Sequence, residues 1–209
     1  AYARSDKKDA SRISIGGRLV ADLLATAGVH RVITMTLHAP QVHGFFSIPV
    51  DHLHATPVIE KWFQELKVAA PSRSFASPDV GNVKRAQVYA NMLGGEICII
   101  DKRRKSGSKT EAKHIIGDVE GKNVIMVDDM ITTGGTISEA CKMLRGHGVK
   151  EIYISATHAV FAPPAMERLE SCDFTKLAVT DTIPIGTRAD RIKDRLSVCT
   201  VAGLLGDAI

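Results

Sequence analysis

The chain has 209 residues, enough for one large or two smaller domains, and its 44% apolar and 24% charged residues are typical of globular proteins rather than disordered or collagen-like chains. Its net charge of +4 comes from short basic clusters, and only 5% of residues are aromatic, so we expect no nucleic-acid partner. Short apolar runs, four widely spread cysteines and no leader segment predict a cytoplasmic protein with reduced thiols and no membrane contact.

Apolar runs of strand length alternate with amphipathic stretches of helix length. Glycines such as Gly28 and Gly148 stand where the helical patterns stop. Several strands are rich in Val and Ile with little alternation, as expected when both faces of a sheet are covered. The pattern predicts an α/β fold with mainly parallel sheets. The predicted strands are 31–37, 96–101, 123–128, 151–157, 176–180 and 196–200, and the predicted helices are 13–27, 56–66, 83–93, 137–147, 163–170 and 201–209.

A polar, Pro-containing stretch at 67–74 predicts a boundary between two lobes. Residues 75–209 contain enough strands and helices for a complete α/β domain, so the second lobe is predicted at 67–209. Residues 1–66 contain one predicted strand and two helices, so we expect the first lobe to be incomplete at its N-terminus.

The strongest motif is the segment 124–136, in which a hydrophobic strand ends in Asp128 and Asp129 and then turns into a helix. Backbone N–H groups and the helix N-terminus point toward a common anion at such a turn. Gly134 and Gly135 allow the backbone to approach that anion closely, and the hydroxyls of Thr132, Thr133 and Thr136 can donate to phosphate oxygens. One Asp can face sugar hydroxyls while the other braces the loop.

An ordinary strand–turn–helix connection with capping Asp residues is the alternative interpretation of this motif. The absence of a Gly-Lys-Ser/Thr ending argues against a P-loop nucleotide hydrolase. The acid pair followed by the Thr-Gly-Gly-Thr turn resembles the phosphoribosyl pyrophosphate (PRPP) binding signature of the type I phosphoribosyltransferase fold. That resemblance implies two phosphoribosyltransferase-like lobes, with the PRPP or ribose 5-phosphate site in residues 67–209.

Six further segments resemble the ribose-phosphate diphosphokinase (PRPP synthetase) family and occur in that family's order: 3–9, 34–51, 77–79, 100–104, 116–120 and 180–184. The resemblance spans essentially the whole chain. It implies transfer of the β,γ-diphosphoryl group of ATP to the C1 hydroxyl of ribose 5-phosphate, which gives PRPP and AMP. It also implies a homo-oligomer, commonly a hexamer built from dimers.

The resemblance also implies roles for individual residues. Lys102 and Arg104 match the family's catalytic pair on a mobile loop, whose flexible part is expected at 105–109. Positive charge there would stabilise the phosphates as they are transferred. Arg4, Ser5 and His38 match the ATP side of the site.

His38 and Asp79 match positions that the family assigns to Mg²⁺, the expected cofactor. Because Mg²⁺ prefers oxygen ligands, His38 is also a candidate for hydrogen bonding to ATP phosphate or to a coordinated water. The other histidines of this region, His43, His52 and His54, are interpreted as structural.

The sequence departs from the family pattern at four of these positions. Ser5 stands where the family usually has Gln, which predicts a weaker nucleotide contact. Thr36 and Ser47 stand where the family commonly has Asp. Their presence predicts weaker metal binding near His38, with Asp51 as a remaining contributor. Thr132 stands where the family usually has an acid in the phosphate loop.

Two other functions are compatible with parts of the pattern. A catalytically silent PRPP-synthetase-associated regulatory subunit fits the missing acids, but it has no need of an intact phosphate loop or of the Lys102/Arg104 pair. A salvage phosphoribosyltransferase shares the loop and leaves the segment 100–104 unexplained. We expect the 209-residue chain alone to have little activity.

Overall fold

The computed structural model of the chain describes residues 2, 4–8, 11–78, 83–104 and 111–209. Contacts between residues divide the chain into two compact units. One consists of Ala1–Ala55 with Val201–Ile209, and the other of Thr56–Thr200. None of the helices in the described part of the chain is long and apolar enough to cross a bilayer.

The first unit contains a parallel pair of short strands, β1 and β2, paired from Val32 opposite Val50 to Met35 opposite Leu53. β1 and α1 confirm the predicted strand and helix, and Gly28 follows α1 with φ 88°, a left-handed conformation that suits glycine. β2 was not predicted, because its sequence Val-Asp-His-Leu is short and half polar. The elements are α1 (Gly16–Thr26), β1 (Val32–Met35), η1 (Pro40–Phe45), β2 (Val50–Leu53) and α6 (Ala202–Ala208).

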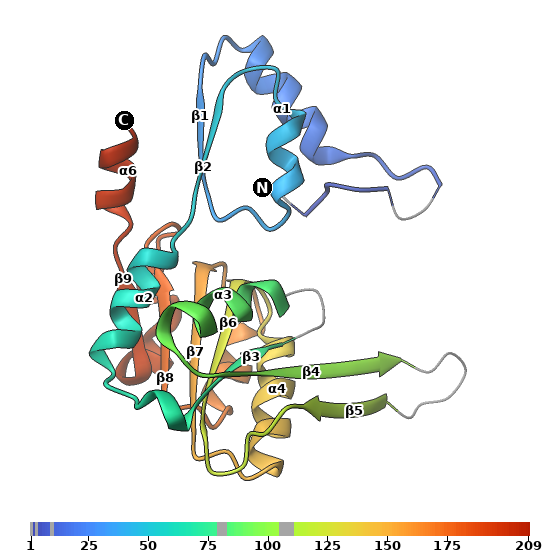
Figure 1. Ribbon diagram of the computed structural model, residues 1–209. Coiled ribbons are helices and arrows are strands. Elements are labelled where there is room, and N and C mark those ends of the chain that lie inside the picture. The colour runs from blue at the N-terminus through green and yellow to red at the C-terminus, as the bar shows by residue number, and fades with distance from the viewer. Residues whose placement is uncertain (1, 3, 9–10, 79–82, 105–110) are drawn as a thin grey trace. The chain divides into compact units, whose positions relative to one another are not determined.

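The second unit is a seven-stranded sheet with the strand order β5-β4-β3-β6-β7-β8-β9 (Figure 1). All neighbouring strands are parallel except β4 and β5, which form an antiparallel hairpin. The mainly parallel α/β fold is therefore confirmed. The elements are α2 (Thr56–Glu65), η2 (Ala70–Ser72), β3 (Arg73–Ser77), α3 (Val83–Leu93), β4 (Glu96–Arg104), β5 (Glu111–Ile116), β6 (Asn123–Ile131), α4 (Gly135–Gly146), β7 (Glu151–Ala159), α5 (Ala165–Glu170), β8 (Lys176–Thr180), η4 (Gly186–Arg195) and β9 (Leu196–Cys199).

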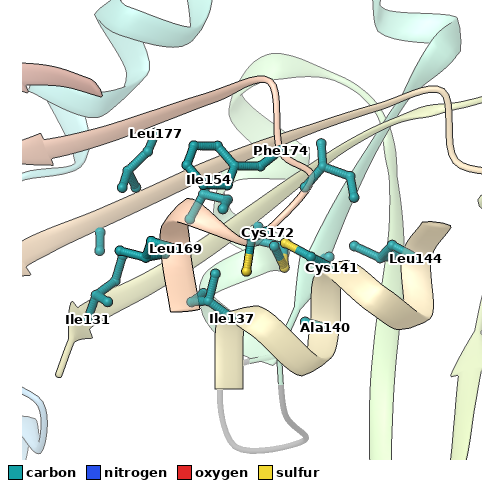
Figure 2. Close-up of a cluster of buried hydrophobic side chains, with 14 of the residues drawn as sticks. Ile131, Ile137, Ala140, Cys141, Leu144, Ile154, Leu169, Cys172, Phe174 and Leu177 are labelled. Atoms are coloured by element: carbon teal, nitrogen blue, oxygen red, sulfur yellow. The ribbon is translucent and has the colours of Figure 1, made fainter. Parts of the chain in front are cut away.

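One face of this sheet is covered by α4 and α5. Figure 2 shows Ile137 and Leu144 of α4 and Leu169 of α5 beside strand residues such as Ile154. The thiols of Cys141 and Cys172 lie together in the same cluster, and the four cysteines of the chain are all free. This packing fixes α4, and with it the turn from β6 into α4.

The other face of the sheet is covered by α2 and α3. Phe75 of β3 contacts Phe63 of α2 edge-on, with 6.2 Å between ring centroids, and stacks with Tyr89 of α3 at 6.4 Å. Because α2 buries its aromatic face here, the structure divides the chain between Ala55 and Thr56. The boundary predicted from composition lies later, after residue 66, and assigns α2 to the first lobe.

Candidate functional site

The candidate phosphate loop lies at the carboxyl edge of the sheet, where the direction of strand succession reverses. The chain passes from β3 outward to β4 and β5, and then returns to β6 on the other side of β3. Ligands of open α/β sheets bind at such a switch point, beyond the carboxyl ends of the strands. The loop that follows β6 is the predicted motif, and the segment after β3 contains Asp79, which lies outside the described residues.

The carbonyl groups of this loop are bonded to the segment that follows β7. The N–H groups of residues 161–162 donate to the carbonyl oxygens of Ile131 and Thr132, each at 3.0 Å. Nη1 of Arg168, on α5, donates to the carbonyl oxygen of Thr133 at 2.9 Å. Three successive carbonyls thus have partners on one side of the loop. The N–H groups of the same peptides are directed to the opposite side, as an anion site requires.

Glycine is required at the entry to α4. Gly134 has φ 70°, which strains any other L-residue, and a Cβ there would lie 3.5 Å from the carbonyl oxygen of Ala165. A Cβ at Gly135 would approach Nη1 of Arg168 to 3.2 Å. The helix therefore begins at Gly135, two residues before its predicted start, and the two glycines let α5 pack directly against the loop.

The predicted acid pair lies on β6 itself, which extends three residues beyond the predicted strand. The Asp129 carboxylate is buried, with 2% of its side chain exposed, and its Oδ1 lies 3.6 Å from Nη1 of Arg85 on α3. Asp128 is half-buried, and its Oδ1 accepts a 2.8 Å hydrogen bond from the Asp129 N–H. The sequence predicted one ligand-facing acid and one bracing acid, and the ion pair favours Asp129 as the brace.

The two carboxyl groups interact strongly. Burial, hydrogen bonding to Asp129 and the negative charge of Asp129, in decreasing order of effect, together raise the pKa of Asp128 to about 8. Arg85 opposes this shift through its positive charge. We therefore expect the ligand-free pair to retain one proton near neutral pH, so that Asp128 can both donate to and accept from a sugar hydroxyl.

This arrangement predicts a pH-dependent gain in stability for Asp128→Asn. Between its ordinary pKa of 3.8 and about 8, native Asp128 holds a proton that the unfolded chain releases, so stability falls as the pH rises through this window. The Asn variant lacks that loss. We expect similar stability near pH 5, and at pH 8 an advantage of about 4 kcal/mol, roughly 8–16 °C in melting temperature. Thermal unfolding at the two pH values measures it, and an equal difference at both would contradict the shared proton.

The proposed ATP-side residues Arg4, Ser5 and His38 belong to the first unit. The carbonyl oxygen of Ser5 accepts a 3.0 Å hydrogen bond from the N–H of Gly17, at the start of α1. Arg4 and His38 are exposed. The chain near residue 5 is therefore attached to the N-terminus of α1, and the roles of these three side chains remain predictions.

The turn that leads to His38 is held by side chains which the sequence interpretation did not assign to it. Thr36 has φ 42°, and its Oγ1 accepts a 3.0 Å hydrogen bond from the N–H of Ala55. Nε2 of His52 accepts from the N–H of Leu37 at 2.9 Å, and burial lowers the pKa of His52, which favours the neutral ring that this bond needs. His52 thus has the structural role expected of it.

The described residues by themselves provide few ligands for a metal ion. Within the described ranges, no three His, Cys, Asp or Glu side chains converge as a metal site requires. Asp51, the remaining acid near His38, is paired with Arg31, which lowers the pKa of its carboxyl group. Mg²⁺ is often held by substrate phosphates with only one or two protein carboxylates, so these residues fit a magnesium that arrives with a nucleotide better than a preformed site.

Lys102 and Arg104 occupy alternate positions of β4, and the backbone of both is paired with β5. The sequence placed them on a mobile loop, whereas the structure describes their backbone as strand. The expected flexible part at 105–109 lies outside the described residues. Figure 1 shows the β4–β5 hairpin projecting from the rest of the sheet.

Comparison with known proteins extends the resemblance to the whole chain. The family described as "Phosphoribosyl synthetase-associated domain" matches residues 108–209. Ribose-phosphate pyrophosphokinases of Deinococcus radiodurans and Gloeobacter violaceus are each 46% identical over 209 residues, all of this chain, which spans 65% and 62% of their lengths.

A solved structure agrees with these sequence matches. The crystal structure of phosphoribosylpyrophosphate synthetase from Mycobacterium smegmatis superposes with a TM-score of 0.90 at 41% identity, covering 99% of this chain and 66% of that one. The identity extends over the entire chain, so this chain is similar throughout its length to ribose-phosphate pyrophosphokinases.

Proposed function

We propose that the protein containing this chain transfers the diphosphoryl group of ATP to the C1 hydroxyl of ribose 5-phosphate and releases AMP. The observation that carries the proposal is the phosphate loop at the switch point of the sheet, with three carbonyls turned away from the anion side. The names of the relatives supply the chemistry, because each is a ribose-phosphate pyrophosphokinase.

In this proposal the loop 131–136 binds the 5-phosphate of the sugar. The N–H groups opposite its bonded carbonyls, the N-terminus of α4 and the Thr hydroxyls each donate to phosphate oxygens. Asp128 contacts the ribose hydroxyls, and Asp129 holds β6 against α3 through Arg85. The sugar is thereby fixed with its C1 hydroxyl directed toward the nucleotide.

Transfer between two anionic substrates needs positive charge at the moving phosphates. We assign that role to Lys102 and Arg104 on β4. Arg4, Ser5 and His38 contact ATP, and Mg²⁺ is bound by the nucleotide phosphates with Asp79 and His38 as protein contributors. We further propose a cytoplasmic homo-oligomer, an assembly in which subunits complete one another's nucleotide sites.

The test is AMP release by the complete gene product, compared with the 209-residue chain. With ATP, magnesium and ribose 5-phosphate we expect AMP and PRPP in equal amounts, and no AMP when the sugar phosphate is omitted. Pyrophosphate and a nucleotide formed from PRPP and a nucleobase would instead indicate a salvage transferase. No turnover by a folded, complete protein would indicate the catalytically silent relative.

A further inference from the structure

A hydrogen bond to the carbonyl of a loop peptide also fixes the direction of the N–H group of the same peptide. In a trans peptide the carbonyl of one residue and the N–H of the next point in opposite directions. Hydrogen bonds to the carbonyls of Ile131, Thr132 and Thr133 therefore also aim the N–H groups of Thr132, Thr133 and Gly134. Those three N–H groups face away from the segment that follows β7.

The third of these bonds differs from the first two. Backbone N–H groups hold the first two carbonyls, which belong to an extension of the β6–β7 pairing. The Thr133 carbonyl is held by a side chain, the guanidinium of Arg168, at 2.9 Å. Arg168 is half-buried on α5, a helix whose Ala165 and Leu169 belong to the buried core. The donor is thus presented by a fixed element.

The orientation of the peptide between Thr133 and Gly134 also depends most on such a hydrogen bond. A peptide flips by rotation about the bonds on either side of it, and glycine accepts φ of either sign at little cost. Gly134 has φ 70° here, so the observed orientation is one of several that its backbone allows. A bond from a rigid helix selects one of them before a ligand arrives, which lowers the entropy lost on binding.

We propose that Arg168 is a positioning residue of the phosphate loop: its guanidinium holds the Thr133 carbonyl so that the Gly134 N–H faces the bound phosphate. The identity of that phosphate as the 5-phosphate of ribose 5-phosphate rests on the proposed function. The orientation of the Gly134 N–H does not, and it can be measured without ligand. The positive charge of the Arg168 guanidinium, which lies near Gly135 at the entry to α4, adds to the attraction of the loop for anions.

The first experiment measures amide ¹H–¹⁵N residual dipolar couplings of the ligand-free chain. In the unaltered protein and in Arg191→Gln, we expect the Gly134 coupling to fit a single N–H direction, opposite to that of the Thr133 carbonyl. Arg191 is a matched control because its guanidinium also contacts α5. Its Nη1 lies 3.4 Å from Oε2 of Glu170, and both side chains are exposed. In Arg168→Gln we expect the Gly134 coupling to change or to average toward zero, while couplings in β6 and α4 stay unchanged.

The second experiment is calorimetric titration with ribose 5-phosphate. We expect Arg168→Gln to bind about tenfold more weakly than the unaltered chain, with Arg168→Lys between them because it keeps the charge and loses the planar donor geometry. Arg191→Gln should bind normally.

The outcomes separate the two proposals. An unchanged Gly134 coupling in Arg168→Gln overturns the positioning role, whatever the protein binds. A changed coupling in a chain that does not bind ribose 5-phosphate supports the positioning role and contradicts the proposed substrate. Equal melting temperatures of Arg168→Gln and Arg191→Gln would exclude general destabilisation as the cause of weaker binding, and unfolding of Arg168→Gln alone would make Arg168 a structural residue and overturn the proposal.

Discussion

Replacement of Lys102 by alanine is expected to lower turnover by about 10²–10³-fold, with little change in the stability of the protein. The diphosphoryl group carries negative charge that shifts as one bond to phosphorus forms and another breaks. A cation that contacts it mainly in the transition state contributes to kcat rather than to KM. Steady-state rates of AMP release at saturating ATP and ribose 5-phosphate give this effect directly.

Arg103 provides the matched control for this substitution. It lies between Lys102 and Arg104 on β4, and alternate positions of a strand share one face of a sheet. Arg103→Ala removes the same charge from the same strand but from the intervening position, so we expect its turnover to fall less than about threefold. Equal losses in Lys102→Ala and Arg103→Ala would attribute the effect to net charge and contradict a specific role for Lys102.

The second large effect is a loss of stability, which we expect in Asp129→Asn. Asp129 is 2% exposed, and its partner Arg85 is 24% exposed. Removal of the carboxylate leaves the guanidinium without its counter-charge in a poorly hydrated position, which costs about 2–4 kcal/mol. Denaturant unfolding at about pH 6 measures the loss.

A double-mutant cycle with Arg85→Met tests the cause of this loss. If the unpaired guanidinium is responsible, the double variant Arg85→Met with Asp129→Asn should recover much of the stability of the single variant Asp129→Asn. Asp128→Asn, one residue earlier on β6, should not be destabilised. Strictly additive losses in the cycle would show that the ion pair does not brace β6 against α3.

The fold was predictable where local composition carries the signal. β6 begins with a continuous run that is rich in Val and Ile, and β7 and β8 are apolar stretches of strand length, as expected for strands covered on both faces. β3 was missed because Arg-Ser-Phe-Ala-Ser contains a single large apolar residue; the strand is buried by its neighbours β4 and β6 rather than by its own hydrophobicity. β5 was missed because an edge strand paired only with β4 can be polar.

The site was predictable where its residues are contiguous in sequence. Asp128 to Thr136 form one strand–turn–helix, so their types and spacing are visible together. Arg85 and Arg168 were not identified, because they reach the loop from α3 and α5 through contacts that depend on the packing of the whole sheet. The assignment of α2 to the second unit depends likewise on Phe63, whose partners Phe75 and Tyr89 lie beyond the predicted boundary.

The most direct test of the central claim follows the phosphorus atoms of ATP. ATP labelled at its β-phosphate is incubated with the complete gene product, magnesium and ribose 5-phosphate, and the products are separated. Diphosphoryl transfer predicts that all the label leaves the nucleotide, so that it appears in PRPP and the AMP formed is unlabelled. Label retained in ADP, or recovered in unchanged ATP despite a folded protein, would contradict the assignment of this chain to PRPP synthesis.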